Sequence, residues 1–139
     1  MHYSVRGIIN IEDGIVLIHR IKKRNDGSFR EYYVVPGGKM EQDETQEQTV
    51  VREIKEELGI EVKPVKKILE YYSEYDDSIQ CFYECEYING DIGTGNGPEM
   101  HRKMAKGELF RAEIINTKEI LNINLVPEKI KILLNGDIS

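Results

Sequence analysis

Apolar residues in the first third of the chain follow the short period of β-strands. Two β-rich apolar runs flank the Asp-Gly dipeptide at 13–14, and such a dipeptide between apolar runs is a strong hairpin signal. Residues 30–35 (REYYVV) predict a third strand, which the Pro-Gly-Gly at 36–38 terminates. This part of the chain is therefore predicted to form a sheet.

The pattern changes to a helical period after these glycines. Thr45 and Gln48 have the spacing of a capping box, and Gly59 stands where a glycine commonly ends a helix. Four apolar residues recur between them at helical spacing and supply one apolar face: Val50, Val51, Ile54 and Leu58. A helix is therefore predicted between Thr45 and Gly59.

The remaining pattern predicts more strands and two short helices. In chain order these are strands at 65–75, 78–88 and 108–115 and helices at 116–121 and 127–134. Pro127 lies in the first turn of the last helix, and Gly136 is expected past its end. The loop at 89–107 is rich in glycine and charge, and loops of that length are usually functional or mobile. Strands dominate, so we expect an α/β fold on a mixed sheet, with one domain over residues 1–139.

Composition indicates an ordinary globular protein, with 40% hydrophobic and 32% charged residues. Because the chain has no apolar run near the roughly 20 residues of a membrane span and no signal-peptide layout at its start, we expect it in the cytoplasm, without a membrane partner. A net charge of −6 argues against nucleic acid as a partner and permits a small anionic ligand only if a cation mediates. For Cys81 and Cys85, free buried thiols are favoured over a disulfide or a metal pair.

Residues 37–60 concentrate negative charge, since seven carboxylates and three bases give 3 − 7 = −4. Glu53, Glu56 and Glu57 are spaced i, i+3 and i+4, so a helix places them on one face. Close carboxylates resist ionising together, and a divalent cation removes that difficulty. Magnesium prefers such oxygen ligands together with substrate phosphates, so the helix is a candidate metal site.

The context of the three glutamates favours a metal site over the alternative of a solvated acidic face. A Gly-Gly turn precedes the helix, Glu44 stands at its entrance, and Arg52 is adjacent to the acidic face. This arrangement resembles the signature of the Nudix (MutT-like) hydrolases, which reads Gly, five residues, Glu, seven residues, Arg-Glu-aliphatic-any-Glu-Glu-any-Gly-aliphatic. Every fixed position is matched: Gly38, Glu44, Arg52, Glu53, Ile54, Glu56, Glu57, Gly59 and Ile60.

The resemblance implies a fold, a reaction and a metal. The fold is an α/β/α sandwich around a mixed β-sheet, with a catalytic helix and a C-terminal helix. The reaction is hydrolysis of a nucleoside diphosphate linked to another moiety, with Mg²⁺ as the cofactor and Mn²⁺ as a substitute. Carried over by position, the metal ligands would be Glu53, Glu56 and Glu57 and the main-chain carbonyl of Gly37.

The resemblance also implies roles for the charged residues around the metal. Arg52 would hold a glutamate in place, and Glu44 would support that network. Family members differ in whether the general base is a glutamate of the signature or a carboxylate from a later loop. Glu53 is therefore the first candidate for the base and Glu99 the second, with a solvated loop residue as the alternative for Glu99.

Substrate contacts are expected from two further residues. Gly38 lets a ligand approach the backbone closely. Arg20 corresponds to an arginine that the family often has at the end of this strand, and an exposed strand end is the alternative reading. The wording of the signature is close to that of members that cleave nucleoside triphosphates, including oxidised ones. That substrate class is preferred over nucleotide sugars, ADP-ribose and dinucleoside polyphosphates.

A second function hypothesis is a non-catalytic module that senses or binds nucleotides on the same fold. Binding-only relatives are expected to lose glutamates of the signature, and this chain retains all of them. The enzyme is therefore the favoured interpretation. Its partner would be a small-molecule nucleoside diphosphate derivative, and the chain would act as a monomer or a homodimer.

Overall fold

The computed structural model describes residues 1–93 and 104–138, with side chains described up to Leu134 in the last helix. Its elements in chain order are β1 (His2–Ile11), β2 (Gly14–Lys23), β3 (Phe29–Val34), β4 (Gly37–Lys39), α1 (Gln46–Leu58), β5 (Glu61–Ser73), β6 (Ser78–Asn89), β7 (Leu109–Asn116), the 3-10 helix η2 (Thr117–Asn122), β8 (Leu125–Val126) and α2 (Glu128–Ile138). Every strand and helix that the sequence predicts is present. The short strands β4 and β8 are additional. Within these residues, no helix has the length and hydropathy that a membrane crossing requires.

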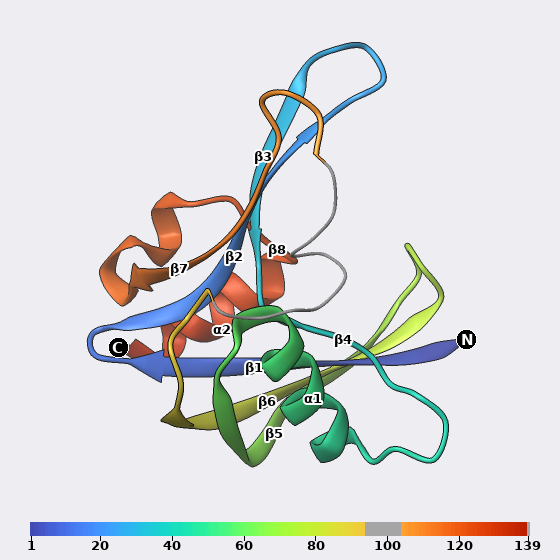
Figure 1. Ribbon diagram of the computed structural model, residues 1–139, viewed down its shortest axis with the longest axis vertical. Coiled ribbons are helices and arrows are strands. Elements are labelled where there is room, and N and C mark those ends of the chain that lie inside the picture. The colour runs from blue at the N-terminus through green and yellow to red at the C-terminus, as the bar shows by residue number, and fades with distance from the viewer. Residues whose placement is uncertain (94–103, 139) are drawn as a thin grey trace.

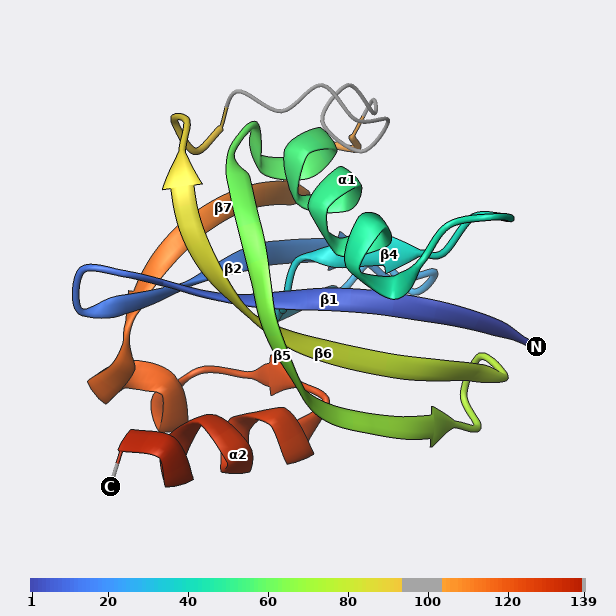
Figure 2. The same ribbon diagram turned by 90° about the horizontal axis from the view of Figure 1, so that it is seen from below.

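The strands form a mixed sheet, as predicted. Their order is β5-β6-β1-β2-β3-β8, with β4 paired to β1 and β7 paired to β2. The pairs β1–β6 and β3–β8 are parallel, and the others are antiparallel. Helices α1 and α2 lie on opposite sides of the strands (Figure 1; Figure 2). This arrangement is the α/β sandwich with one long central helix and one C-terminal helix that the sequence indicated.

The predicted hairpin at the Asp-Gly dipeptide joins β1 to β2, but its loop is shifted by one residue. Ile11 pairs with Gly14, so Glu12 and Asp13 form the turn, and Glu12 takes the left-handed conformation with φ of 56°. Gly14 instead allows β7 to approach closely. A Cβ at Gly14 would lie 2.5 Å from the Ile114 side chain and 2.8 Å from the carbonyl oxygen of Ile115.

Helix α1 begins and ends as predicted. The capping box of Thr45 and Gln48 is formed in both directions, and Gly59 closes the helix in the left-handed conformation. Its apolar residues Val50, Ile54 and Leu58 are fully buried. They pack on the α1 side of the sheet, in a cluster of buried residues that also holds the free thiols of both cysteines.

Helix α2 covers the other side of the sheet. Ile130 and Leu134 pack there with residues of β1, β2 and β6, among them Phe82. The helix runs to Ile138, so the expectation that Gly136 lies past its end was wrong. A glycine inside a helix costs only about 1 kcal/mol relative to alanine, which weakens a helix without ending it.

Burial of the α1 face generates a stability test. Ile54→Ala is expected to lower the free energy of unfolding by about 2–5 kcal/mol, because Ile54 is fully buried and its removal leaves a cavity between α1 and the sheet. Urea unfolding followed by circular dichroism measures this change. As a control, Ile132→Ala on α2 should change stability by no more than about 0.5 kcal/mol, since Ile132 is 66% exposed. Equal effects of the two substitutions would contradict the packing described above.

Candidate active site

Strand β4 brings two glycines against both β1 and α1. Gly37 and Gly38 pair with Arg6 and Val5 of β1. A Cβ at Gly37 would collide with the Val5 carbonyl oxygen, and one at Gly38 would lie 2.5 Å from the Glu53 carboxylate. Glycine is therefore required at both positions for the backbone to pass between the strand and the helix. The close approach at Gly38 is to a carboxylate of the signature itself.

Arg52 gathers the carboxylates at the start of α1. Its Nε and Nη2 donate to the two oxygens of Glu44 at 2.6 and 3.0 Å. Its Nη1 donates to Glu53 at 2.9 Å and to Glu56 at 3.3 Å. A further bond from Nη2 to the carbonyl oxygen of Lys39, at 3.0 Å, ties the helix to the end of β4. One guanidinium thus contacts two glutamates of the acidic face as well as Glu44.

Glu44 is the most firmly held member of this cluster. Besides Arg52, the Thr49 hydroxyl and the Glu41 backbone N–H donate to its carboxylate at 2.8 and 3.0 Å. The hydrogen bonds from Arg52 are the main reason that the pKa of Glu44 falls from its usual 4.5 to about 2. The same contact raises the pKa of Arg52 above its already high value. Both groups are therefore charged at neutral pH and lock the loop before α1 to the helix.

Glu57 faces β4 rather than Arg52. The backbone N–H of Gly37 donates to its Oε1 at 2.8 Å, and the residue is only 7% exposed. Glu53 and Glu56 have side-chain exposures of 16% and 38%, so access to solvent increases from Glu57 to Glu56. The helix therefore presents three carboxylates in three different environments.

These carboxylates supply the hard oxygen donors that Mg²⁺ prefers, together with the backbone of Gly37. In the part of the chain that the structure describes, no three Asp, Glu, His or Cys side chains converge closely enough to hold a metal ion. The reason is that Glu53 and Glu56 turn toward Arg52 while Glu57 turns toward the Gly37 N–H. The donor chemistry fits a divalent cation, and binding one requires these carboxylates to turn from their protein partners. Glu99, the second candidate for the general base, lies outside the described residues.

Arg20 lies on β2, and its guanidinium lies over two aromatic rings. Its guanidinium carbon is 5.1 Å from the ring centre of Phe110 and 5.9 Å from that of Tyr32. Its Nε is buried and has no hydrogen-bond partner among the described residues. The neighbouring His19 is held between Glu31 and Glu113, with each ring nitrogen 2.6 Å from a carboxylate oxygen. His19 therefore links β2 to β3 and β7 through these two carboxylates. Arg20, by contrast, still has a hydrogen-bond donor that a ligand could use.

A pocket of about 440 Å³ opens beside β4, and sequence reasoning did not find it. Its lining comes from six strands and from the connections beside them: Arg6, Lys22, Arg30, Tyr32, Val34, Val35, Tyr71, Ser73, Tyr75, Gln80, Val126 and Pro127. Three of these residues are cationic and none is acidic, although the chain has a net charge of −6. Arg6 pairs with Gly37, so the pocket adjoins the glycines that contact α1. No sequence signal marked it, because its lining comes from residues far apart in the chain.

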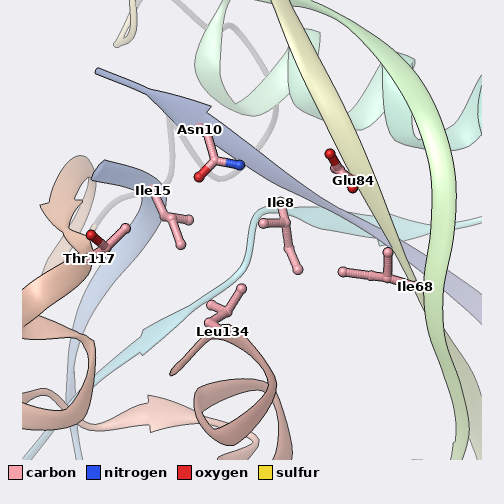
Figure 3. A pocket seen from close by; sticks show the side chains of 7 residues that line it. All are labelled: Ile8, Asn10, Ile15, Ile68, Glu84, Thr117 and Leu134. Atoms are coloured by element: carbon pink, nitrogen blue, oxygen red, sulfur yellow. The ribbon is translucent and has the colours of Figure 1, made fainter. Parts of the chain in front are cut away.

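A smaller hollow of about 230 Å³ lies on the α2 side of the strands (Figure 3). Ile8, Ile15, Ile68 and Leu134 form its apolar wall, and Glu84 is its only charged lining residue. It shares no residue with the Arg52 cluster. The cationic pocket beside β4 shares no residue with that cluster either, but Arg6 in its lining pairs with Gly37, which contacts Glu57 of α1.

Comparisons with known proteins agree with this architecture. A family model described as NUDIX domain matches residues 1–134. The chain is 37% identical over 98 residues to an ADP-ribose pyrophosphatase from Methanocaldococcus jannaschii, covering 67% of this chain and 55% of that protein. It is 37% identical over 62 residues to an 8-oxo-dGTP diphosphatase from Proteus vulgaris, covering 45% of this chain and 53% of the relative. The matches thus span about half the length of these relatives.

Solved structures agree in fold. The solution structure of the E. coli ORF135 protein has a TM-score of 0.65 and 24% sequence identity, and the alignment covers 99% of this chain and 89% of that protein. At this level of identity the likeness concerns the fold.

The Glu44–Arg52 contact generates a pH-dependent stability test. Because the pKa of Glu44 is lowered in the folded protein, its charge stabilises the fold above pH 4.5, and this contribution is lost as the pH falls from 4.5 toward 2. Glu44→Gln should therefore lower the free energy of unfolding by about 2 kcal/mol at pH 7. The gap between the two proteins should shrink steadily in denaturant titrations from pH 5 down to pH 2.

Glu41→Gln is the matched control. The Glu41 side chain is 68% exposed and reaches Arg52 only at 3.6 Å, so its removal should change stability by less than about 1 kcal/mol. A stability gap for Glu44→Gln that stays constant with pH would show that the carboxylate charge is not the cause.

Proposed function

This chain belongs to the NUDIX family, and we propose that it is a Mg²⁺-dependent pyrophosphohydrolase that cleaves a nucleoside diphosphate linked to another moiety. The observation that carries this proposal is the Arg52 cluster, in which one arginine contacts Glu44, Glu53 and Glu56 beside Gly38. The fourth signature glutamate, Glu57, accepts from the N–H of Gly37. Retention of every glutamate supports an enzyme over the alternative, a non-catalytic module that binds or senses nucleotides.

The metal would be held by Glu53, Glu56 and Glu57 and by the main-chain carbonyl of Gly37. Bound there, Mg²⁺ or Mn²⁺ would neutralise diphosphate charge and lower the pKa of an attacking water. Glu56 is the most exposed of the three carboxylates, so it is the side chain that can turn from Arg52 at the lowest cost. Glu57 accepts a hydrogen bond from the N–H of Gly37, the residue whose carbonyl is the fourth proposed ligand.

Arg52 and Glu44 act as positioning residues in this proposal. Two hydrogen bonds that Arg52 donates to Glu44 fix the guanidinium. The fixed guanidinium in turn orients Glu53. A carboxylate held in this way is prepared to take a proton from water, so Glu53 is the first candidate for the general base. Glu99 is the second candidate.

The cationic pocket beside β4 supports a nucleotide as the substrate. Its lining carries three positive side chains, and Arg20 adds a guanidinium with unused donor capacity on the same strand as Lys22. The two relatives bear names with different substrates, ADP-ribose and 8-oxo-dGTP. Within this range we favour a nucleoside triphosphate, oxidised or not, over ADP-ribose, nucleotide sugars and dinucleoside polyphosphates. The ligand is a small molecule, and Gly38 and Arg20 are its expected contacts beside the pocket.

Removing one carboxylate tests the enzyme and its metal together. In Glu56→Gln, the Mg²⁺-dependent kcat/KM for nucleoside triphosphates should fall by roughly 100-fold or more, since a metal ligand is lost. The measurement is a product-resolved assay with nucleoside triphosphates, nucleotide sugars, ADP-ribose and dinucleoside polyphosphates. Glu47→Gln on the exposed side of the same helix is the control and should retain full turnover. If the unmodified chain turned over none of these substrates, the binding module would replace the enzyme.

The general base is tested by comparing Glu53→Gln with Glu99→Gln at saturating Mg²⁺. The true base should lose roughly 10²- to 10⁴-fold in kcat and flatten the acidic limb of the pH profile. Glu53 is also a metal ligand in this proposal, so the Mg²⁺ concentration for half-maximal activity must be measured for both variants. A larger loss in Glu99→Gln, with an unchanged Mg²⁺ requirement, would move the base to the later loop.

A further inference from the structure

We propose that the pocket beside β4 recognises the base of the nucleotide through Arg6, and that Arg6 selects guanine over adenine. This inference rests on the proposed function, because it assigns the substrate class of the same site. Arg6 is the cation at the β1 side of the pocket, and β1 is the strand that carries the glycines of β4. The pairing of Arg6 with Gly37 places the pocket next to the strand that contacts α1.

The Arg6 guanidinium is held in a fixed orientation. Its Nε donates to Gln80 Oε1 at 3.1 Å, and its Nη1 donates to the carbonyl oxygen of Val35 at 2.9 Å. A guanidinium has five N–H groups. Two of them are used in these contacts, and the remaining three are on the Nη atoms. Arg6 is half-buried and lines the pocket, so these remaining donors are the ones available to a ligand.

A chain of buried polar groups fixes the orientation of the Gln80 side-chain amide. Gln80 is 7% exposed, and its Nε2 donates to Ser78 Oγ at 2.7 Å. Ser78 is fully buried, and its hydroxyl donates to Asp76 at 2.6 Å. The Gln80 amide oxygen must therefore face Arg6. Both ends of this amide are occupied, so Gln80 orients Arg6 and does not read the ligand itself.

The pocket consequently offers donors where a base edge would lie. Guanine presents two adjacent acceptors, O6 and N7, which an arginine binds with two parallel N–H groups. Adenine presents an acceptor at N7 but an amino donor at N6, which would face the guanidinium N–H groups. Oxidation of guanine at C8 places a proton on N7, so 8-oxoguanine also loses one of the two acceptors. The arrangement favours unmodified guanine over both.

The remaining lining suits a purine attached to phosphates. Val34, Val35, Val126 and Pro127 supply apolar walls for a planar ring, while Lys22 and Arg30 supply positive charge for phosphate oxygens. Arg30 already lies 4.3 Å from the ring centre of Tyr32, which fixes its position on the wall. A volume of about 440 Å³ falls within the range of small-ligand pockets.

The first test uses the unmodified chain. With Mg²⁺, kcat/KM for dGTP should exceed that for dATP and for 8-oxo-dGTP by roughly 10- to 100-fold. Equal values for dGTP and dATP, or a preference for dATP or 8-oxo-dGTP, would overturn the inference while leaving the proposed hydrolase intact. Absence of any turnover would defeat the proposed function instead. Calorimetric binding of GMP and AMP then decides the base preference separately, with tighter GMP supporting it and equal affinity refuting it.

The second test exchanges the donors of Arg6. Glutamine pairs with N6 and N7 of adenine, so Arg6→Gln should reduce the dGTP-to-dATP ratio of kcat/KM at least tenfold and move it toward adenine. Lys23→Gln is the control. It also removes one positive charge, but Lys23 points to the face of β2 opposite to the pocket-lining Lys22, so the ratio should stay unchanged. If Arg6→Gln lowered both nucleotides equally, Arg6 would act on phosphate or on the fold, and the assignment would be wrong. If the glutamine variant does not fold, Arg6→Lys should also lower the dGTP-to-dATP ratio of kcat/KM, since lysine lacks the planar pair of donors.

Discussion

The carboxylates of the signature depend on a single guanidinium for their positions. Arg52 donates to Glu44, Glu53 and Glu56 and to the end of β4, so a region with a surplus of negative charge folds around one cation. The strongest of these contacts, to Glu44, lies at the entrance of α1 and not on its acidic face. Arg52 can therefore give up Glu53 or Glu56 to another cation without losing its own place. That asymmetry would let the helix be stable before a metal binds and still supply the proposed ligands to it.

The two glycines of β4 transmit this arrangement to the sheet. Gly38 lies against the carboxylate of Glu53, Gly37 donates to Glu57, and both pair with β1. A side chain at Gly38 would collide with Glu53 of α1, and one at Gly37 would collide with β1. Because Arg6 pairs with Gly37, the β1–β4 ladder connects the signature glutamates of α1 with the cationic pocket. In the proposed function, this ladder would link metal binding to nucleotide recognition.

Much of this could be predicted from the sequence, because it depends on neighbours in the chain. The capping box at Thr45, the left-handed Gly59 and the apolar face of α1 follow from spacings of a few residues. The spacing of Glu53, Glu56 and Glu57 likewise fixed the acidic face. The turn lies at 12–13, one residue before the predicted Asp-Gly position. Gly14 is in β2, where the absence of a side chain allows close contact with the distant strand β7. Gly136 was predicted to lie past the end of the last helix, but it lies inside α2. The helix propensity of glycine, about 1 kcal/mol below that of alanine, does not by itself decide where a helix ends.

The pocket could not be predicted, because its lining residues come from six strands and form a pocket only when those strands assemble. Arg6 carries no motif, and its orientation depends on Gln80 and Val35, which lie 74 and 29 residues away. Assembly also reverses the local charge, since a chain with net charge −6 gathers three cations and no acid around this cavity. The acidic helix has a surplus of negative charge and the pocket has a surplus of positive charge. A metal-bound nucleotide, the substrate proposed above, would complement both, with the cation at the helix and the anion at the pocket.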